Sequence, residues 1–163
     1  MLKNKLCVAV HFVWATWDRQ PLVTEEIERD LYKYIEAVCN DDHCKVLALG
    51  GMPDHVHLLV LLSNTVTMAD LIRHVKGGSS RSVPKRLTPG EWFAWQGSYG
   101  AFSVSQGNIP KVVAYIQNQK QHHTEGTLYP NAEETNEIVL SVPAQAATGR
   151  FAPQRRNLFP RSS

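Results

Sequence analysis

The chain has 163 residues and a net charge of +2, and its length suits one domain with a sizeable core. Because 43% of the residues are apolar and 20% are charged, disorder of the whole chain is excluded. No apolar run approaches the roughly 18 to 20 residues of a membrane span, and His11 ends the apolar stretch near the N-terminus with no small-residue cleavage site after it. The three cysteines are an odd number at irregular spacing and form no Cys-x-x-Cys pair, so neither a disulfide framework nor a zinc ribbon is supported. We expect a soluble, cytoplasmic protein.

The first half of the chain alternates strand-like and helix-like segments. Residues 6–16 are rich in β-branched and aromatic side chains and predict a buried strand. Thr24, followed by two glutamates, predicts the start of a helix that runs to about residue 39, with apolar side chains at helical spacing. Residues 46–50 and 55–62 predict two further strands, joined by a tight Gly-Met-Pro-Asp connection.

The second half continues this alternation. Thr67 caps a second predicted helix, which meets a Gly-Gly pair at 77–78 that either ends it or marks a close backbone approach. Strand-like pieces lie within residues 92–105, and Asn108 begins a last helix that we expect to run to about His123. The order β-α-β-β-α-β followed by a helix predicts an α+β fold, a ferredoxin-like sandwich with a four-stranded antiparallel sheet and its helices on one face.

The last part of the chain differs from the rest in its pattern. We expect one domain over residues 1–125, because the periodic segments end there. The tail after Val142 shows no periodicity and contains Pro153 and Pro160. We therefore expect residues 126–163 to form a C-terminal extension that is partly irregular, and its tail to be mobile or to lie across a partner.

His55 and His57 form the most informative pair of polar residues, because they interrupt an apolar predicted strand. Side chains at i and i+2 of a strand point to the same face, so the two imidazoles can chelate a divalent metal. The alternative is that both are half-buried polar residues of a strand. Three other histidines, His11, His43 and His74, have no assigned role.

Tyr115 and Gln119 are four residues apart on the last predicted helix and therefore share one of its faces. A phenol can attack a phosphorus that a metal has made electrophilic, provided that a nearby cation or base favours the phenolate. The amide oxygen of Gln119 can complete a site for a hard metal. The alternative for Tyr115 is a role in the core or at an interface. His122 and His123 follow at the end of the same helix, where they either interact with the helix dipole or contact a phosphate or metal.

Three segments together resemble one protein family: GGMPDHVHLLV (50–60), WQGSYGAFSVS (95–105) and VAYIQNQKQHH (113–123). They are similar to segments of the single-tyrosine HUH transposases, the IS200-like enzymes of small bacterial insertion sequences that move as single-stranded DNA. HUH stands for His-hydrophobe-His. The opening strand HFVWATWDR (11–19) also fits, and the resemblance spans roughly residues 5–125 in the same order.

The resemblance implies a role for each candidate residue. His55, His57 and Gln119 would hold Mg²⁺ or Mn²⁺, and Tyr115 would be the nucleophile that forms a 5′-phosphotyrosine link and releases a 3′ hydroxyl. The substrate would be single-stranded DNA beside a hairpin. The enzyme would be a homodimer whose tyrosine helix can complete the partner's active site.

The distribution of charge agrees with a nucleic-acid partner, although solvated helix faces would produce the same pattern. Residues 17–66 hold nine acidic and four basic side chains, whereas residues 67–123 hold seven basic and two acidic ones. The candidate DNA contacts are the basic residues in and just after the second predicted helix: Arg73, Lys76, Arg81, Lys85 and Arg86.

Two other functions stay open on the sequence. Transposase-like proteins that process chromosomal palindromic repeats share these motifs, so a host-adapted relative is one alternative. A decayed module that binds DNA without cutting it is the other, although the intact Tyr115, His55, His57 and Gln119 argue against decay. A phosphohydrolase of the histidine-triad type is disfavoured, because Leu59 stands where a third histidine is needed.

Overall fold

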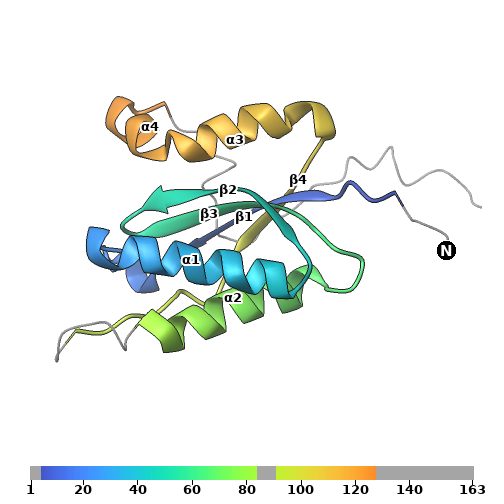
Figure 1. The fold of residues 1–163 in the computed structure, drawn as a ribbon. Helices are drawn as coiled ribbons and strands as arrows, with labels where there is room; N and C mark the ends of the chain where they lie inside the picture. Colours follow the sequence, from blue (N-terminus) through green and yellow to red (C-terminus); the bar gives the residue numbers. More distant parts are fainter. Residues whose placement is uncertain (1–4, 84–90, 128–163) are drawn as a thin grey trace, which may run out of the picture.

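The computed structural model describes residues 5–83 and 91–127 of the chain (Figure 1). Its strands are β1 (Ala9–Ala15), β2 (Lys45–Met52), β3 (His55–Leu61) and β4 (Gly100–Val104). Its helices are α1 (Glu25–Asp41), α2 (Met68–Ser82), α3 (Ile109–Gln117) and α4 (Gln119–Glu125), with short 3-10 turns η1 (Trp17–Arg19) and η3 (Gln106–Asn108). The strands and helices predicted before residue 106 are present in the predicted order.

The four strands form one antiparallel sheet in the order β2-β3-β1-β4. This order, with its β-α-β-β-α-β connection, confirms the predicted ferredoxin-like α+β fold. Strand β1 is buried at every position and lies at the centre of the sheet, as its continuous apolar run predicts. The alternately exposed β4 lies at one edge.

Helices cover both faces of the sheet (Figure 1). Helices α1 and α2 pack on one face, as predicted, and bury the side chains of alternate strand positions: Val10, Phe12, Trp14, Val56, Leu58 and Val60. Helices α3 and α4 form a third layer on the opposite face, where a smaller core contains Ala9, Ala48, Leu59, Tyr115 and Ile116. The space between this third layer and the sheet holds the candidate site.

The last helix differs from the prediction of one continuous helix to His123. It is divided at Asn118, whose φ of −102° and ψ of 20° depart from helical values. The Asn118 side chain donates a hydrogen bond to the carbonyl of Ala114 at 2.9 Å. Such local bonding by an Asn amide competes with helix continuation, which is the physical reason for the break. Helix α4 then ends at Gly126 in the left-handed conformation.

The Gly-Gly pair at 77–78 lies inside α2 and does not end it. A Cβ on Gly78 would overlap the hydroxyl of Tyr34 on α1. Of the two predictions for this pair, the one that Gly-Gly ends the helix is wrong. Gly78 does mark the close approach of another element, but the approaching group is a side chain and not a backbone.

Part of the sequence-based prediction lies outside the described residues. Lys85 and Arg86 belong to this part, as do residues 128–163 of the predicted extension. Within the described residues, no helix is both long and apolar enough to cross a membrane.

Candidate active site

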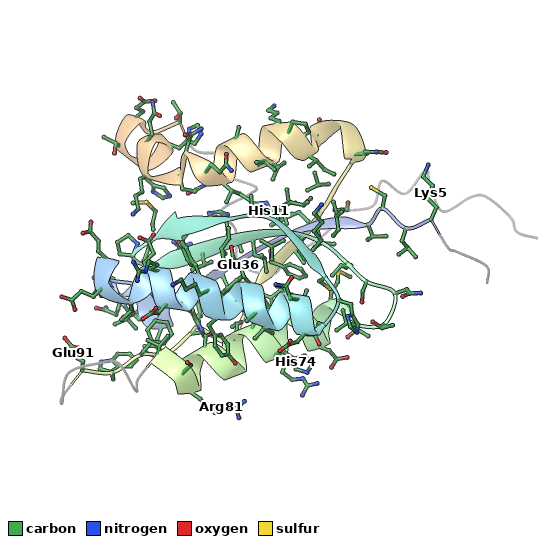
Figure 2. All side chains as sticks on the ribbon, viewed as in Figure 1. Lys5, His11, Glu36, His74, Arg81 and Glu91 are labelled. Carbon is green, nitrogen blue, oxygen red and sulfur yellow. The ribbon has the colours of Figure 1, made fainter. Side chains whose placement is uncertain are left out.

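Strand alternation directs three histidines toward α3 and α4. Val56 and Leu58 of β3 face the α1 and α2 layer, so His55 and His57 face the other side with Leu59. In β1, Phe12 faces α1 and α2, and His11 therefore shares the face of the other two histidines, where Figure 2 shows it. All three side chains are at least 97% buried.

His55 and His57 lie edge to face, with ring centroids 5.0 Å apart. Nδ1 of His55 lies 2.7 Å from Oδ1 of Asp54, and Nδ1 of His57 lies 2.9 Å from Nε2 of His11. Because Nδ1 of each ring faces another side chain, Asp54 for His55 and His11 for His57, Nε2 is the nitrogen oriented for a ligand. Both Nε2 atoms are buried.

Asp54 is itself held in place by Arg19, whose guanidinium donates to Oδ2 at 3.2 Å. Burial raises the pKa of Asp54, but the hydrogen bond and charge of His55, with the charge of Arg19, outweigh burial and leave that pKa below its usual value. Asp54 is therefore a carboxylate at neutral pH and an acceptor for the Nδ1 hydrogen of His55.

Tyr115 of α3 lies beside the histidine pair, and the buried Gln119 is the first residue of α4. The Tyr115 ring lies 6.0 Å from the ring of His57 in an edge-to-face contact. Gln119 is 1% exposed and its Oε1 is buried. His123 and His122 join the same cluster, 5.0 Å from the rings of His55 and Tyr115 respectively. These two histidines do more than end a helix: their rings pack against the candidate ligand and nucleophile.

A glycine permits α3 to lie this close to the sheet. Gly50 is opposite His57 in the β2–β3 register, and a Cβ there would lie 2.6 Å from the backbone oxygen of Ile116. Helix α4 is tied to α1 by an ion pair between Lys120 and Glu28 at 3.1 Å. Together these contacts place the segment that contains Tyr115 and Gln119 directly over the HUH strand.

The donor set fits a divalent cation. It consists of two imidazole nitrogens and the amide oxygen of Gln119, a neutral set that leaves other coordination positions to water or phosphate oxygens. No group of three His, Cys, Asp or Glu side chains able to hold a metal occurs in residues 5–83 and 91–127. The buried amide oxygen of Gln119 is the candidate for a third protein donor beside the two imidazoles.

Two residues beside the site were not identified as participants from the sequence. The sequence pattern assigns no role to His11, although its strand pairs with β3. The pattern places Asp54 in a turn, and its position directly before His55 is the signal that points to a further role.

The candidate DNA contacts on α2 lie on the opposite side of the sheet from the histidines (Figure 1). Arg73 pairs with Asp70 at 2.6 Å, and Figure 2 shows Arg81 on the outer side of α2. The ammonium of Lys76 donates to the carbonyls of Gln96 and Ser98 at 2.7 and 2.9 Å. Burial lowers the pKa of Lys76 to about 8. Lys76 thus stabilises the segment before β4.

Comparison with known proteins finds transposases. A family model described as "Transposase IS200 like" matches residues 5–119. The chain is 25% identical over 116 residues to the ISDra2 transposase TnpA of Deinococcus radiodurans, covering 67% of this chain and 81% of that protein. A crystal structure from Deinococcus radiodurans R1, of a protein assigned as a transposase, aligns with a TM-score of 0.57 and 28% identity over 73% of this chain and 98% of that chain.

A second solved structure has a similar fold. It is that of a REP-associated tyrosine transposase bound to a REP hairpin, with a TM-score of 0.58 and 16% identity over 78% of this chain and 76% of that chain. At this identity the likeness concerns the fold.

Proposed function

Because the chain belongs to the IS200-like transposase family, we propose that it cuts and rejoins single-stranded DNA beside hairpins, through a covalent bond between Tyr115 and a 5′ phosphate. The observation that carries this proposal is the contact between the Tyr115 ring and His57 of the HUH pair. The Tyr115 ring also contacts His122, so histidine rings from β3 and from α4 both pack against this phenol.

The proposed chemistry begins at the phenol of Tyr115. The hydroxyl oxygen of Tyr115 attacks the phosphorus, and the bond from phosphorus to the 3′ oxygen breaks. The 5′ end stays on Tyr115, a 3′ hydroxyl leaves, and overall the phenolic proton is transferred to that hydroxyl. Attack by another 3′ hydroxyl on the phosphotyrosine reverses the step and joins two strands.

His55, His57 and Gln119 would hold the Mg²⁺ or Mn²⁺ ion, which when bound would polarise the scissile phosphate. Asp54 and His11 orient the two imidazoles through their Nδ1 atoms, so that Nε2 of each is directed to the ligand position. The burial of the donor set excludes bulk water from this place.

The hairpin and the dimer are supported by different arguments. The solved relative with a REP hairpin supports a hairpin substrate for this chain. A homodimer, which the family resemblance implies, would protect an edge strand of the sheet, since β2 and β4 are the edge strands of the sheet that the described residues form.

Processing of chromosomal palindromic repeats is a second candidate function, because the likeness to the REP-associated protein favours it. The chemistry at Tyr115 would be the same, and only the source of the hairpin would differ. The DNA beside the gene distinguishes the two: imperfect palindromes on both sides indicate a mobile element, whereas hairpin repeats scattered over the chromosome indicate host use.

The test of the proposed function is covalent capture. The protein is incubated with single-stranded hairpin oligonucleotides and Mn²⁺, and a protein–DNA species is sought on a denaturing gel. We expect such a species for the wild type and none for Tyr115→Phe, which keeps the ring and should bind the hairpin within a few-fold of the wild type. An unchanged covalent band in Tyr115→Phe would disprove the assignment of the nucleophile.

A further inference from the structure

The four tryptophans of the chain divide into two buried and two exposed. Trp14 and Trp95 are packed edge to face in the core, with ring centroids 5.8 Å apart. Trp17 and Trp92 are 56% and 53% exposed. Isolated exposed apolar side chains are common, but an indole carries a large apolar area, and two of them exposed on connected segments require an explanation.

The two exposed tryptophans lie on segments that are bonded to each other. The backbone N–H of Trp17 donates to the carbonyl of Ala94 at 2.9 Å, and Thr16 forms a bridge with Trp95. Trp92 is two residues before Ala94. The alternate residues Phe93 and Trp95 are buried, which anchors the segment and directs Trp92 outward.

This surface is continuous with the candidate active site. The N–H of Thr16 donates to the carbonyl of Asp54 at 2.9 Å, and the side chain of Arg19 pairs with the carboxylate of Asp54. The same carboxylate holds His55. In the sequence, Trp17 therefore lies between Thr16 and Arg19, which both contact Asp54, the residue before the candidate metal ligand His55. Figure 2 shows Glu91, the residue before Trp92, at the end of the molecule where α1 begins. The turn before His55 lies at the same end, because the N–H of Val23, just before α1, donates to the carbonyl of Pro53.

The turn that presents Trp17 has an unusual backbone. Asp18 and Arg19 have φ values of 49° and 50°, in the left-handed region that residues with a Cβ rarely adopt. Two consecutive residues of this kind carry a conformational cost, which the hydrogen bonds to Ala94 and Asp54 and the Arg19–Asp54 ion pair offset. The turn thus holds an exposed indole beside the site at an energetic cost.

We propose that Trp17 and Trp92 form a stacking surface for unpaired bases of the DNA strand that leads to the scissile phosphate. This inference rests on the proposed function and adds a base-binding surface to it. Indoles stack on any base and so suit a single strand of varied sequence, while the partly exposed guanidinium of Arg19 supplies positive charge beside the first indole.

Binding measurements on the full chain test the proposal. The probes are a hairpin oligonucleotide with an unpaired flank on the scissile side and the same hairpin without the flank, both in chelator so that no cutting occurs. We expect Trp17→Ala and Trp92→Ala each to weaken binding of the flanked hairpin about tenfold, the loss of one base stack, and to leave the bare hairpin unaffected. Trp17→Phe should retain affinity within a few-fold, because a phenyl ring still stacks.

Matched controls make the result specific. Met68→Ala removes another exposed apolar side chain, 47% exposed at the start of α2, and should change neither affinity. Replacing flank nucleotides one at a time by abasic residues should locate the stacked base, and at that position Trp17→Ala should cause no further loss. Equal affinity of wild type and both alanine variants for the flanked hairpin would overturn the proposal.

Two further outcomes separate this proposal from others. If the alanine variants lower the oligomeric mass in sedimentation without changing affinity for the flank, the surface is an interface between copies and the proposal is overturned. If the wild type forms no covalent species while its flank affinity depends on the two tryptophans, the stacking surface is supported and the cutting activity fails.

Discussion

Nε2 of His11 lies 2.9 Å from Nδ1 of His57, and the two rings are stacked with centroids 5.1 Å apart. A histidine on β1 therefore orients the ring of a candidate metal ligand on the neighbouring strand β3. This pair is buried, so water does not replace either partner easily.

The first prediction concerns this hydrogen bond. His11→Phe keeps a ring of similar shape and removes the nitrogen, so the orientation of His57 is lost. We expect the Mn²⁺ concentration for half-maximal cutting to rise about 10- to 100-fold, with smaller loss at saturating metal. His11→Asn, which can still bond to Nδ1, should recover part of the affinity. An unchanged metal dependence in His11→Phe would show that His57 does not need this partner.

The second prediction is that His55→Ala and His57→Ala each abolish cutting, and that a moderate increase in Mg²⁺ does not restore it. Each histidine would supply one of about three protein ligands, so its loss weakens a hard-metal site severely. Covalent capture in chelator-treated buffer with metal added back measures the effect. Full activity of either variant under these conditions would exclude the ligand role.

The third prediction concerns Gly50. A methyl group at Gly50 would lie 2.6 Å from the backbone oxygen of Ile116, so Gly50→Ala must push α3 away from the sheet. We expect a loss of about 1–3 kcal/mol in the free energy of unfolding and a marked fall in cutting, because Tyr115 moves with the helix. Gly77→Ala is the matched control, since no atom lies within 4 Å of a Cβ there. Equal cutting by the two variants would contradict this account.

The fourth prediction separates the basic residues of α2. Arg81→Ala should lower the salt slope of DNA binding by about 0.7, the value for one phosphate contact on a single strand. Lys76→Ala should mainly lower the melting temperature, because its ammonium donates to the carbonyls of residues 96–98. If both variants leave affinity and slope untouched, the DNA follows another surface.

The fifth prediction concerns which chain supplies the nucleophile. Tyr115 lies against His57 of its own chain, and the Lys120–Glu28 pair holds α4 on its own α1, so we expect active sites formed within one chain. Heterodimers of Tyr115→Phe with His57→Ala should then be inactive. Recovered cutting in verified heterodimers would show that the tyrosine helix is exchanged between subunits, the arrangement that the family resemblance implies.

Local pattern in the sequence was sufficient for most of the fold. The alternation along β3 predicted that His55 and His57 share a face, because the period of a strand is two residues whatever surrounds it. The helical spacing of α1 and the cap at Thr67, which accepts from the N–H of Asp70 at 3.0 Å, are equally local properties. Local pattern predicted which of these residues share a face, whereas the roles of His55, His57, Tyr115 and Gln119 came from the family resemblance and stay predictions.

Other features depend on contacts between segments far apart in the chain, and only the tertiary structure decided them. His11 and His57 are 46 residues apart and meet because β1 and β3 are neighbours in the sheet. Lys76 was expected at the DNA, but its ammonium reaches carbonyls some 20 residues away in sequence. The break at Asn118 and the packing of α3 across Gly50 bring Tyr115 to the histidines. No periodicity in the sequence encodes the face on which a terminal helix lies, because its apolar stripe could be buried on either side of the sheet.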